Sequence, residues 1–200
     1  NEIIKSDEIK IGLKIIKSLL NGYIDLNTLS ITNVEFLNGT TSKTSNGIYR
    51  INISNLHIHS NQFIFSTRNT EILNKEGNLS IFNKDGKINN IPFKELSVFN
   101  KAESGFYQYL AFFELDENII EKEELINLDE FYDKNINLYL SSKGYFDSKQ
   151  NKITSINKYI FNNSSLVTES NYEIQDVEAV LYTNIDQNLS GLFSAKIPDQ

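Results

Sequence analysis

The sequence predicts a mainly β fold: a single curved antiparallel sheet, half-barrel or jellyroll-like, with an N-terminal amphipathic helix and a short helix near residues 117–132. Two observations carry this prediction. From about Leu26 onward, apolar residues alternate with polar ones and asparagine-rich turns separate the segments. Before Leu26, apolar residues recur every three or four positions. With 200 residues and 40% hydrophobic content, one domain covering 1–200 is expected.

The N-terminal helix is predicted over residues 7–20. Its apolar stripe consists of Ile9, Leu13, Ile16 and Leu20, widened by Ile15 and Leu19. Ser6 or Asp7 is suited to cap its start, and Asn21-Gly22 to stop it. We expect the stripe to pack on the sheet as a lid or brace, with the lysines of the helix on the solvated side.

The stretch INISNLHIHSNQFIF, residues 51–65, indicates strands whose register slips twice. Ile51 and Ile53 share one parity, whereas Leu56 and Ile58 occupy the other. A bulge or tight turn near Ser54-Asn55, and another near Asn61, would explain the slips. His57 and His59 would then face away from Leu56 and Ile58.

Later segments continue the pattern. Asp85-Gly86 is typical of a hairpin turn, and the aromatic stretch from Ser104 to Leu115 is apolar on both parities, as expected of a central strand. Asp116 is suited to cap the helix predicted near 117–132. Alternating segments after residue 136 predict further strands.

Composition excludes several classes of function. A net charge of -7 with a pI near 4.9 argues against a nucleic-acid partner. The absence of cysteine excludes disulfides and thiolate chemistry. No apolar run is long enough to span a bilayer, so we expect membrane contact only through a segment preceding Asn1.

Catalytic motifs are not recognisable. The sequence has no Walker loop, no Gly-x-Gly-x-x-Gly and no Gly-x-Ser-x-Gly, so we expect a protein that is not an enzyme and has no cofactor. One alternative is a metal-dependent enzyme in which His57 and His59, two positions apart on a strand, are joined by a carboxylate. Apart from this alternative, no metal ligands are assigned.

The aromatic strands suggest a ligand face. The candidate residues are large and lie in the two most aromatic segments: Phe63, Phe65, Phe106, Tyr109, Phe112 and Phe113. Short strands, asparagine-rich turns and an introductory helix resemble, in style and without a diagnostic motif, the β-jellyroll and half-barrel proteins that bacteria use to move or shield lipids. The resemblance implies an extracytoplasmic module, periplasmic or at the cell surface, that binds or transfers a lipid or another amphipathic ligand.

A second interpretation fits the same pattern. Pilin-like or adhesin-like surface subunits also join an N-terminal helix to an antiparallel sheet, and they would use these strands to contact another envelope protein. An exposed strand edge would then be the working surface. A continuous apolar groove would favour the lipid, whereas a filled core with an unpaired edge would favour protein contacts.

Overall fold

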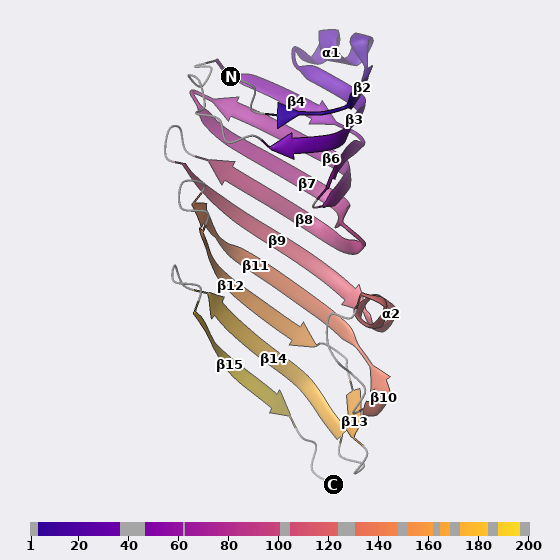
Figure 1. Cartoon of the computed structure of the whole chain (residues 1–200), viewed down its shortest axis with the longest axis vertical. Helices are drawn as coiled ribbons and strands as arrows, with labels where there is room; N and C mark the ends of the chain where they lie inside the picture. The colour runs from indigo at the N-terminus through magenta and orange to yellow at the C-terminus, as the bar shows by residue number, and fades with distance from the viewer. Residues whose placement is uncertain are drawn as a thin grey trace. The chain divides into compact units, whose positions relative to one another are not determined.

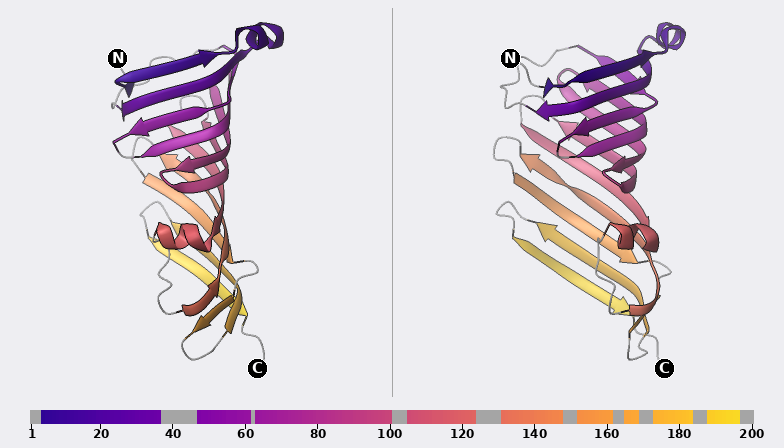
Figure 2. Two further views of the ribbon diagram at one scale, coloured as in Figure 1. Left: turned by 90° about the vertical axis from the view of Figure 1, so that its right-hand side faces the viewer. Right: turned by 45° about the vertical axis from the view of Figure 1, so that its right-hand side comes forward.

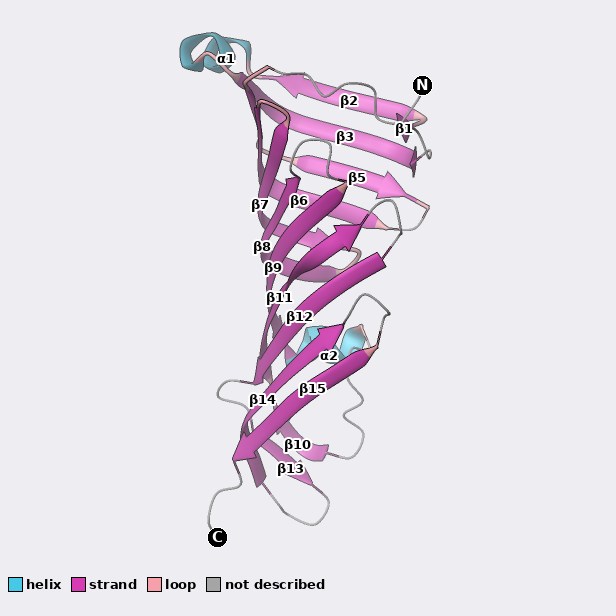
Figure 3. Ribbon diagram, turned by 90° about the vertical axis from the view of Figure 1, so that its left-hand side faces the viewer, coloured by secondary structure: helices cyan, strands magenta, loops and turns pink. Residues whose placement is uncertain are grey.

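The structure is a computed structural model that describes residues 4–36, 47–61, 63–100, 105–123, 131–147, 152–161, 165–168, 173–183 and 188–196. It is mainly β, as predicted, with a large mixed sheet and two short helices (Figures 1 and 3). The chain divides into two compact units, 1–108 and 109–200. This division does not test whether both fold as one domain, so the single-domain prediction stays a prediction.

The first unit contains eight strands and one helix among its described residues. They are β1 (Ile4–Lys5), β2 (Glu8–Leu13), α1 (Ile15–Asn21), β3 (Ile24–Phe36), β4 (Tyr49–Ile53), β5 (Leu56–Ser60), β6 (Ile64–Lys75), β7 (Asn78–Ile88) and β8 (Ile91–Asn100). β3, β4, β6, β7 and β8 are successive neighbours. β2 pairs with β3, and β5 pairs with both β3 and β6.

The second unit contains the remaining strands and helix. They are β9 (Phe106–Asp116), which begins just before the division, α2 (Glu117–Lys122), β10 (Phe131–Asn135), β11 (Asn137–Asp147), β12 (Lys152–Phe161), β13 (Ser165–Thr168), β14 (Glu173–Thr183) and β15 (Leu189–Lys196). The order is β9, β11, β12, β14, β13 and β10, with β15 beside β14. Its buried apolar side chains include Ala111, Leu115, Ile120, Ile136, Leu138 and Val177.

The sheet is not purely antiparallel, which corrects the prediction. β3 runs parallel to β4 and β5, while β4 and β5 are antiparallel to β6. β4 and β5 act as one interrupted strand, because both lie between β3 and β6. At the interruption, Ser54 N–H donates to the Leu26 carbonyl at 2.9 Å and Leu29 N–H donates to the Asn55 carbonyl at 2.8 Å. The register slip predicted near Ser54-Asn55 is confirmed.

The predicted helix over residues 7–20 is wrong for its first half. Residues 8–13 form β2, and only Ile15–Asn21 is helical (Figure 2). Ile9, Ile11 and Leu13 alternate strictly, whereas only Ile9 and Leu13 fit the helical stripe. Isoleucine and Gly12 are also poor helix formers. Pairing with β3 decides the outcome in favour of the strand.

The second predicted helix is shorter than expected where it is described. α2 ends at Lys122, and Phe131 already belongs to β10; residues 124–130 lie outside the described part. Asp116 is the N-cap, since its carboxylate accepts a hydrogen bond from Ile119 N–H at 3.0 Å. No helix among the described residues is both long and apolar enough to cross a membrane.

The turn predicted at Asp85-Gly86 is also wrong, because β7 continues through it. Asp85 has a φ of 51°, a left-handed conformation that aspartate tolerates better than most residues. The neighbouring turns are built instead at Glu76-Gly77 and at Asn89, which also have positive φ. Asp85 therefore marks an irregularity inside a long strand.

The centre of the core of the first unit is aliphatic and lies on one face of the sheet. Its buried centre is Leu26, Ile53 and Leu56. Five half-buried residues pack against this centre: Leu29, Ile51, Ile58, Phe65 and Ile72. The other face carries a row of neighbours in register across β3, β4, β6 and β7, namely Asp25, Asn52, Glu71 and Phe82.

Candidate binding surface

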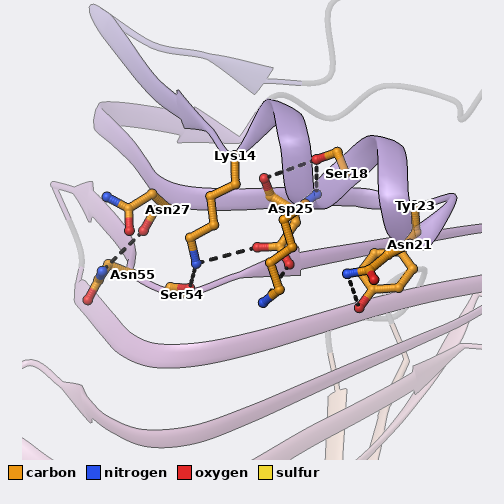
Figure 4. A network of polar contacts seen from close by, with 9 residues as sticks. Lys14, Ser18, Asn21, Tyr23, Asp25, Asn27, Ser54 and Asn55 are labelled. Atoms are coloured by element: carbon orange, nitrogen blue, oxygen red, sulfur yellow. Dashed lines mark hydrogen bonds and ion pairs between the residues drawn. The ribbon is translucent and has the colours of Figure 1, made fainter.

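Asp25 is the most deeply buried charged residue among those that the structure describes in the first unit. It follows Ile24 at the start of β3, and only 1% of its surface is exposed. Lys14 Nζ lies 3.4 Å from Oδ1 (Figure 4). Lys17 Nζ lies 3.0 Å from Oδ2. The buried carboxylate is therefore held between two ammonium groups.

Further contacts join the same residue to the helix and to β4. Asp25 N–H donates to Ser18 Oγ at 2.9 Å, and the Asp25 carbonyl accepts from Lys14 N–H at 2.9 Å. Lys14 Nζ also donates to Ser54 Oγ at 2.6 Å. Asp25 thus links α1, β3 and the interruption between β4 and β5 through side-chain and backbone contacts (Figure 4).

The two lysines determine the protonation state of Asp25. Burial acts to raise the pKa of this carboxyl, but the close contact with Lys17 and the charge of Lys14 outweigh burial, so the pKa lies below its usual 3.8. Reciprocally, the contact with Asp25 raises the pKa of Lys17 above 10.5. The ion pair is charged throughout the neutral pH range.

A pH dependence of stability follows from these directions. A carboxyl whose pKa is depressed on folding stabilises the folded state above its unfolded pKa, and this contribution is lost as pH falls through the folded value. We expect the unfolding free energy of the wild type to drop below pH 3.8, the ordinary value of Asp25. An Asp25→Asn variant, compared by urea denaturation from neutral to acidic pH, should show a smaller acid-induced loss; an identical loss in both proteins would contradict this role.

The polar residues of α1 contact the rest of the unit, whereas its apolar side chains are exposed to solvent. All seven residues of α1 are described, and none is buried. Exposed apolar side chains continue into β2, and together they form what we call the apolar edge: Ile9, Ile11, Leu13, Ile15, Ile16, Leu19 and Leu20, which are 53–81% exposed. Single exposed aliphatic residues are common on protein surfaces, but seven within twelve positions indicate an interaction surface.

The orientation of α1 is opposite to the one predicted. We expected the apolar stripe to pack on the sheet and the lysines to face solvent; instead Lys14, Lys17 and Ser18 contact Asp25. A seven-residue helix is too short to be stable by itself, so its contacts with the rest of the unit decide its placement. Gly22, in the left-handed conformation with φ 70°, ends it by donating its N–H to the Ser18 carbonyl at 3.1 Å.

A polar pocket of about 260 Å³ lies beside Asp25 on the same face of the sheet. Lysines and acids line it in equal number, with Lys17 and Lys84 against Asp25 and Glu71. Arg50 Nε contacts Glu71 at 2.8 Å, so this carboxylate is already paired. The pocket lining is chemically mixed and contrasts with the aliphatic apolar edge.

The two histidines lie on β5 with exposed side chains, opposite in direction to Leu56 and Ile58 as predicted. His57 is in register with Ser30 and Ser66, and His59 with Thr32 and Ile64. Within the described ranges, no three side chains of histidine, cysteine, aspartate or glutamate are grouped as metal ligands would be.

The six aromatic candidates are divided between the two units. Phe63 and Phe65 belong to the first unit, and the Phe65 ring stacks on Phe93 at a centroid distance of 5.6 Å. Phe93 is buried, so this pair contributes to the core of the unit. Phe106 begins β9 and is 49% exposed.

The remaining candidates lie further along β9. Phe112 and Phe113 are adjacent in the strand and therefore point to opposite faces; Phe112 is exposed and Phe113 is half-buried. The Tyr109 hydroxyl accepts a hydrogen bond from Ser142 Oγ at 3.3 Å. As ligand-contacting residues, all six stay a prediction.

Sequence reasoning missed Asp25 and the role of its lysines. One signal was present: an acid between Ile24 and Leu26 in an alternating strand must be solvated or paired. Nothing in the spacing identified which cations would pair with it. Comparison with protein-family models, with curated proteins and with solved structures finds no match, so the physical arrangement alone carries the functional argument.

Proposed function

We propose that this protein is a non-catalytic, extracytoplasmic binding module that holds a lipid or another amphipathic ligand at the apolar edge. The single observation that supports this proposal is the run of seven exposed aliphatic side chains on β2 and α1. Each ligand methylene removed from water there would contribute about 0.8 kcal/mol. We also propose that the sheet is curved like a half-barrel or a jellyroll.

Two lysine side chains lie beside the aliphatic surface of the apolar edge. Lys14 and Lys17 share the single carboxylate of Asp25, and Lys17 remains 58% exposed at its side chain. An amphiphile with an anionic head group and an acyl chain therefore matches the surface better than a purely apolar compound. The proposal places the protein in a bacterial envelope, where such ligands are abundant.

Detergent or fatty-acid binding tests this function directly. Oleate added at about one hundred times its dissociation constant should stabilise the protein by about 2.7 kcal/mol, measured as a rise in melting temperature. Leu20→Ser, at a position 81% exposed on α1, should abolish most of the rise without lowering the melting temperature of the ligand-free protein.

A matched control is available in the second unit. Leu192 on β15 is 70% exposed and lies outside the apolar edge, so Leu192→Ser should leave the oleate effect unchanged. Equal losses in both variants, or no stabilisation of the wild type by oleate, would contradict the proposed function.

A second candidate function is a pilin-like or adhesin-like surface subunit that contacts another protein. One observation favours it: in the described part of the chain, β2 pairs on one side with β3 and has no strand on its other side. Edge strands of this kind add a strand from a partner through backbone hydrogen bonds. In this candidate the same apolar side chains contact a protein rather than an acyl chain.

A further inference from the structure

The edge strand β2 has two chemically different faces, one charged and one aliphatic. Charges lie on one face, at Glu8 and Lys10, whose side chains form an exposed ion pair of 3.1 Å. The other face presents Ile9, Ile11 and Leu13, each more than half exposed. An edge with an exposed aliphatic row favours addition of another strand.

We propose that β2 pairs with β2 of a second copy of this chain, antiparallel and about a two-fold axis that passes through Ile11. The inference rests on the second candidate function, contact between proteins at the sheet edge, and names the partner. A two-fold interface is self-complementary, so the strand must match its own reversed sequence. The sequence of β2 meets this requirement in one register over residues 9–13.

In this register the aliphatic side chains of the two copies pair with one another. Ile11, on the axis, lies opposite Ile11 of the second copy, and Ile9 of each copy lies opposite Leu13 of the other. Directly opposed side chains in antiparallel strands are close enough to pack, with Cβ atoms about 5 Å apart. The three exposed residues of each copy would thus form three aliphatic cross-strand pairs.

The residues on the polar face also face compatible partners in the same register. Lys10 lies opposite Gly12, which has no side chain to obstruct the lysine stem. Glu8 lies opposite Lys14, the residue that follows β2 and directs its ammonium group to the Asp25 side of the sheet. This register therefore places no two like charges directly opposite each other.

Neighbouring two-fold registers are less favourable. An axis through Lys10 would place two lysines directly opposite each other, and an axis through Gly12 would place Lys10 opposite Lys14 twice; like charges in these positions are destabilising. An axis through Ile9 would oppose Glu8 and Lys10 but leave Leu13 outside the pairing of β2 with β2. Of these registers, only the axis through Ile11 pairs all three aliphatic residues of β2 without opposing like charges.

Single cysteine variants provide the test, because the chain contains no cysteine of its own. Ile11→Cys should form a disulfide-linked dimer under oxidised glutathione, since the two sulfurs face each other across the axis. Ile11 is 63% exposed, so the substitution leaves the fold intact. Non-reducing electrophoresis measures the product.

Two control variants distinguish the registers. In the proposed pairing, residue 10 is about 7 Å along the strand from the position facing its copy, and residue 9 about 14 Å. Lys10→Cys and Ile9→Cys should therefore form much less dimer than Ile11→Cys. Preferential cross-linking at either control position, or equal and slow cross-linking at all three, would overturn the proposal.

Sedimentation supplies an independent measurement without oxidation. The wild-type chain should dimerise with increasing concentration, and Ile11→Lys should remain monomeric because it would oppose two lysines on the axis. A monomeric wild type at all concentrations would contradict the pairing. This result would leave the oleate effect at Leu20 untouched, so failure of the homodimer and failure of ligand binding are separate outcomes.

Discussion

Asp25→Asn is expected to lower the unfolding free energy of the first unit by about 2–4 kcal/mol. The substitution keeps the size of the side chain but removes the negative charge that pairs with Lys14 and Lys17. Removing one partner of a buried ion pair costs several kcal/mol, because the groups left behind lose their compensation. Lys17 is exposed and Lys14 is only half-buried, so the lysines left behind are partly solvated. The estimate therefore lies below the upper limit for a fully buried pair.

Urea denaturation measures the global effect, and hydrogen exchange locates it. Backbone amides of α1 and of Lys14 should lose protection more than those of β7, because Asp25 holds the helix to β3. Because α1 orients the apolar edge, oleate binding should also weaken in this variant.

Glu8→Gln is the matched control. It removes the acid of the Lys10–Glu8 pair, in which both side chains are more than half exposed. Exposed pairs contribute at most about 1 kcal/mol, and often less, so a small change is expected. Equal destabilisation by both substitutions would show that Asp25 has no special structural role.

Much of the β architecture was predictable because it follows from local periodicity. Alternation predicted the strands of residues 49–65, and the change of parity between Ile53 and Leu56 predicted their interruption. The structure shows why the parity signal is reliable: Ile53 and Leu56 are both buried, so an extra residue must be absorbed between them.

Pairing partners were not predictable in the same way. Nothing local indicates that β3 runs parallel to β4 and β5, because parallel alignment depends on where the intervening chain returns. The helix prediction for residues 8–13 was wrong for a related reason. Ile9 and Leu13 fit both a helix and a strand, and contact with β3, a tertiary effect, selects the strand.

The apolar edge was not predicted from the sequence. The predicted ligand face consists of aromatic residues and stays a prediction, whereas the aliphatic residues of β2 and α1 were expected to pack on the sheet. Large aromatic side chains are as often core as surface; Phe65, stacked on buried Phe93, illustrates the ambiguity. The exposure of Leu19 and Leu20 depends on Asp25, and no local pattern contains this information.

Gly86→Ala is expected to destabilise the first unit by about 2–3 kcal/mol, the range for inserting atoms into a packed core. A methyl group at this position would collide with the Phe93 ring and with the Ser66 carbonyl. Phe93 is only 2% exposed and stacks on Phe65, so it has no free space into which to move. The Ser66 carbonyl is backbone and also resists displacement.

Gly12→Ala tests whether the effect is steric rather than a general property of glycine in strands. A methyl group at Gly12 would lie 3.5 Å from Thr28 N and 3.7 Å from the nearest side-chain carbons, ordinary contact distances. Its effect should stay within about 0.5 kcal/mol, as for most surface substitutions. Because both glycines lie in strands of the same unit, a comparable loss in both variants, measured by urea denaturation, would show that the packing of Phe93 against Gly86 is not the cause.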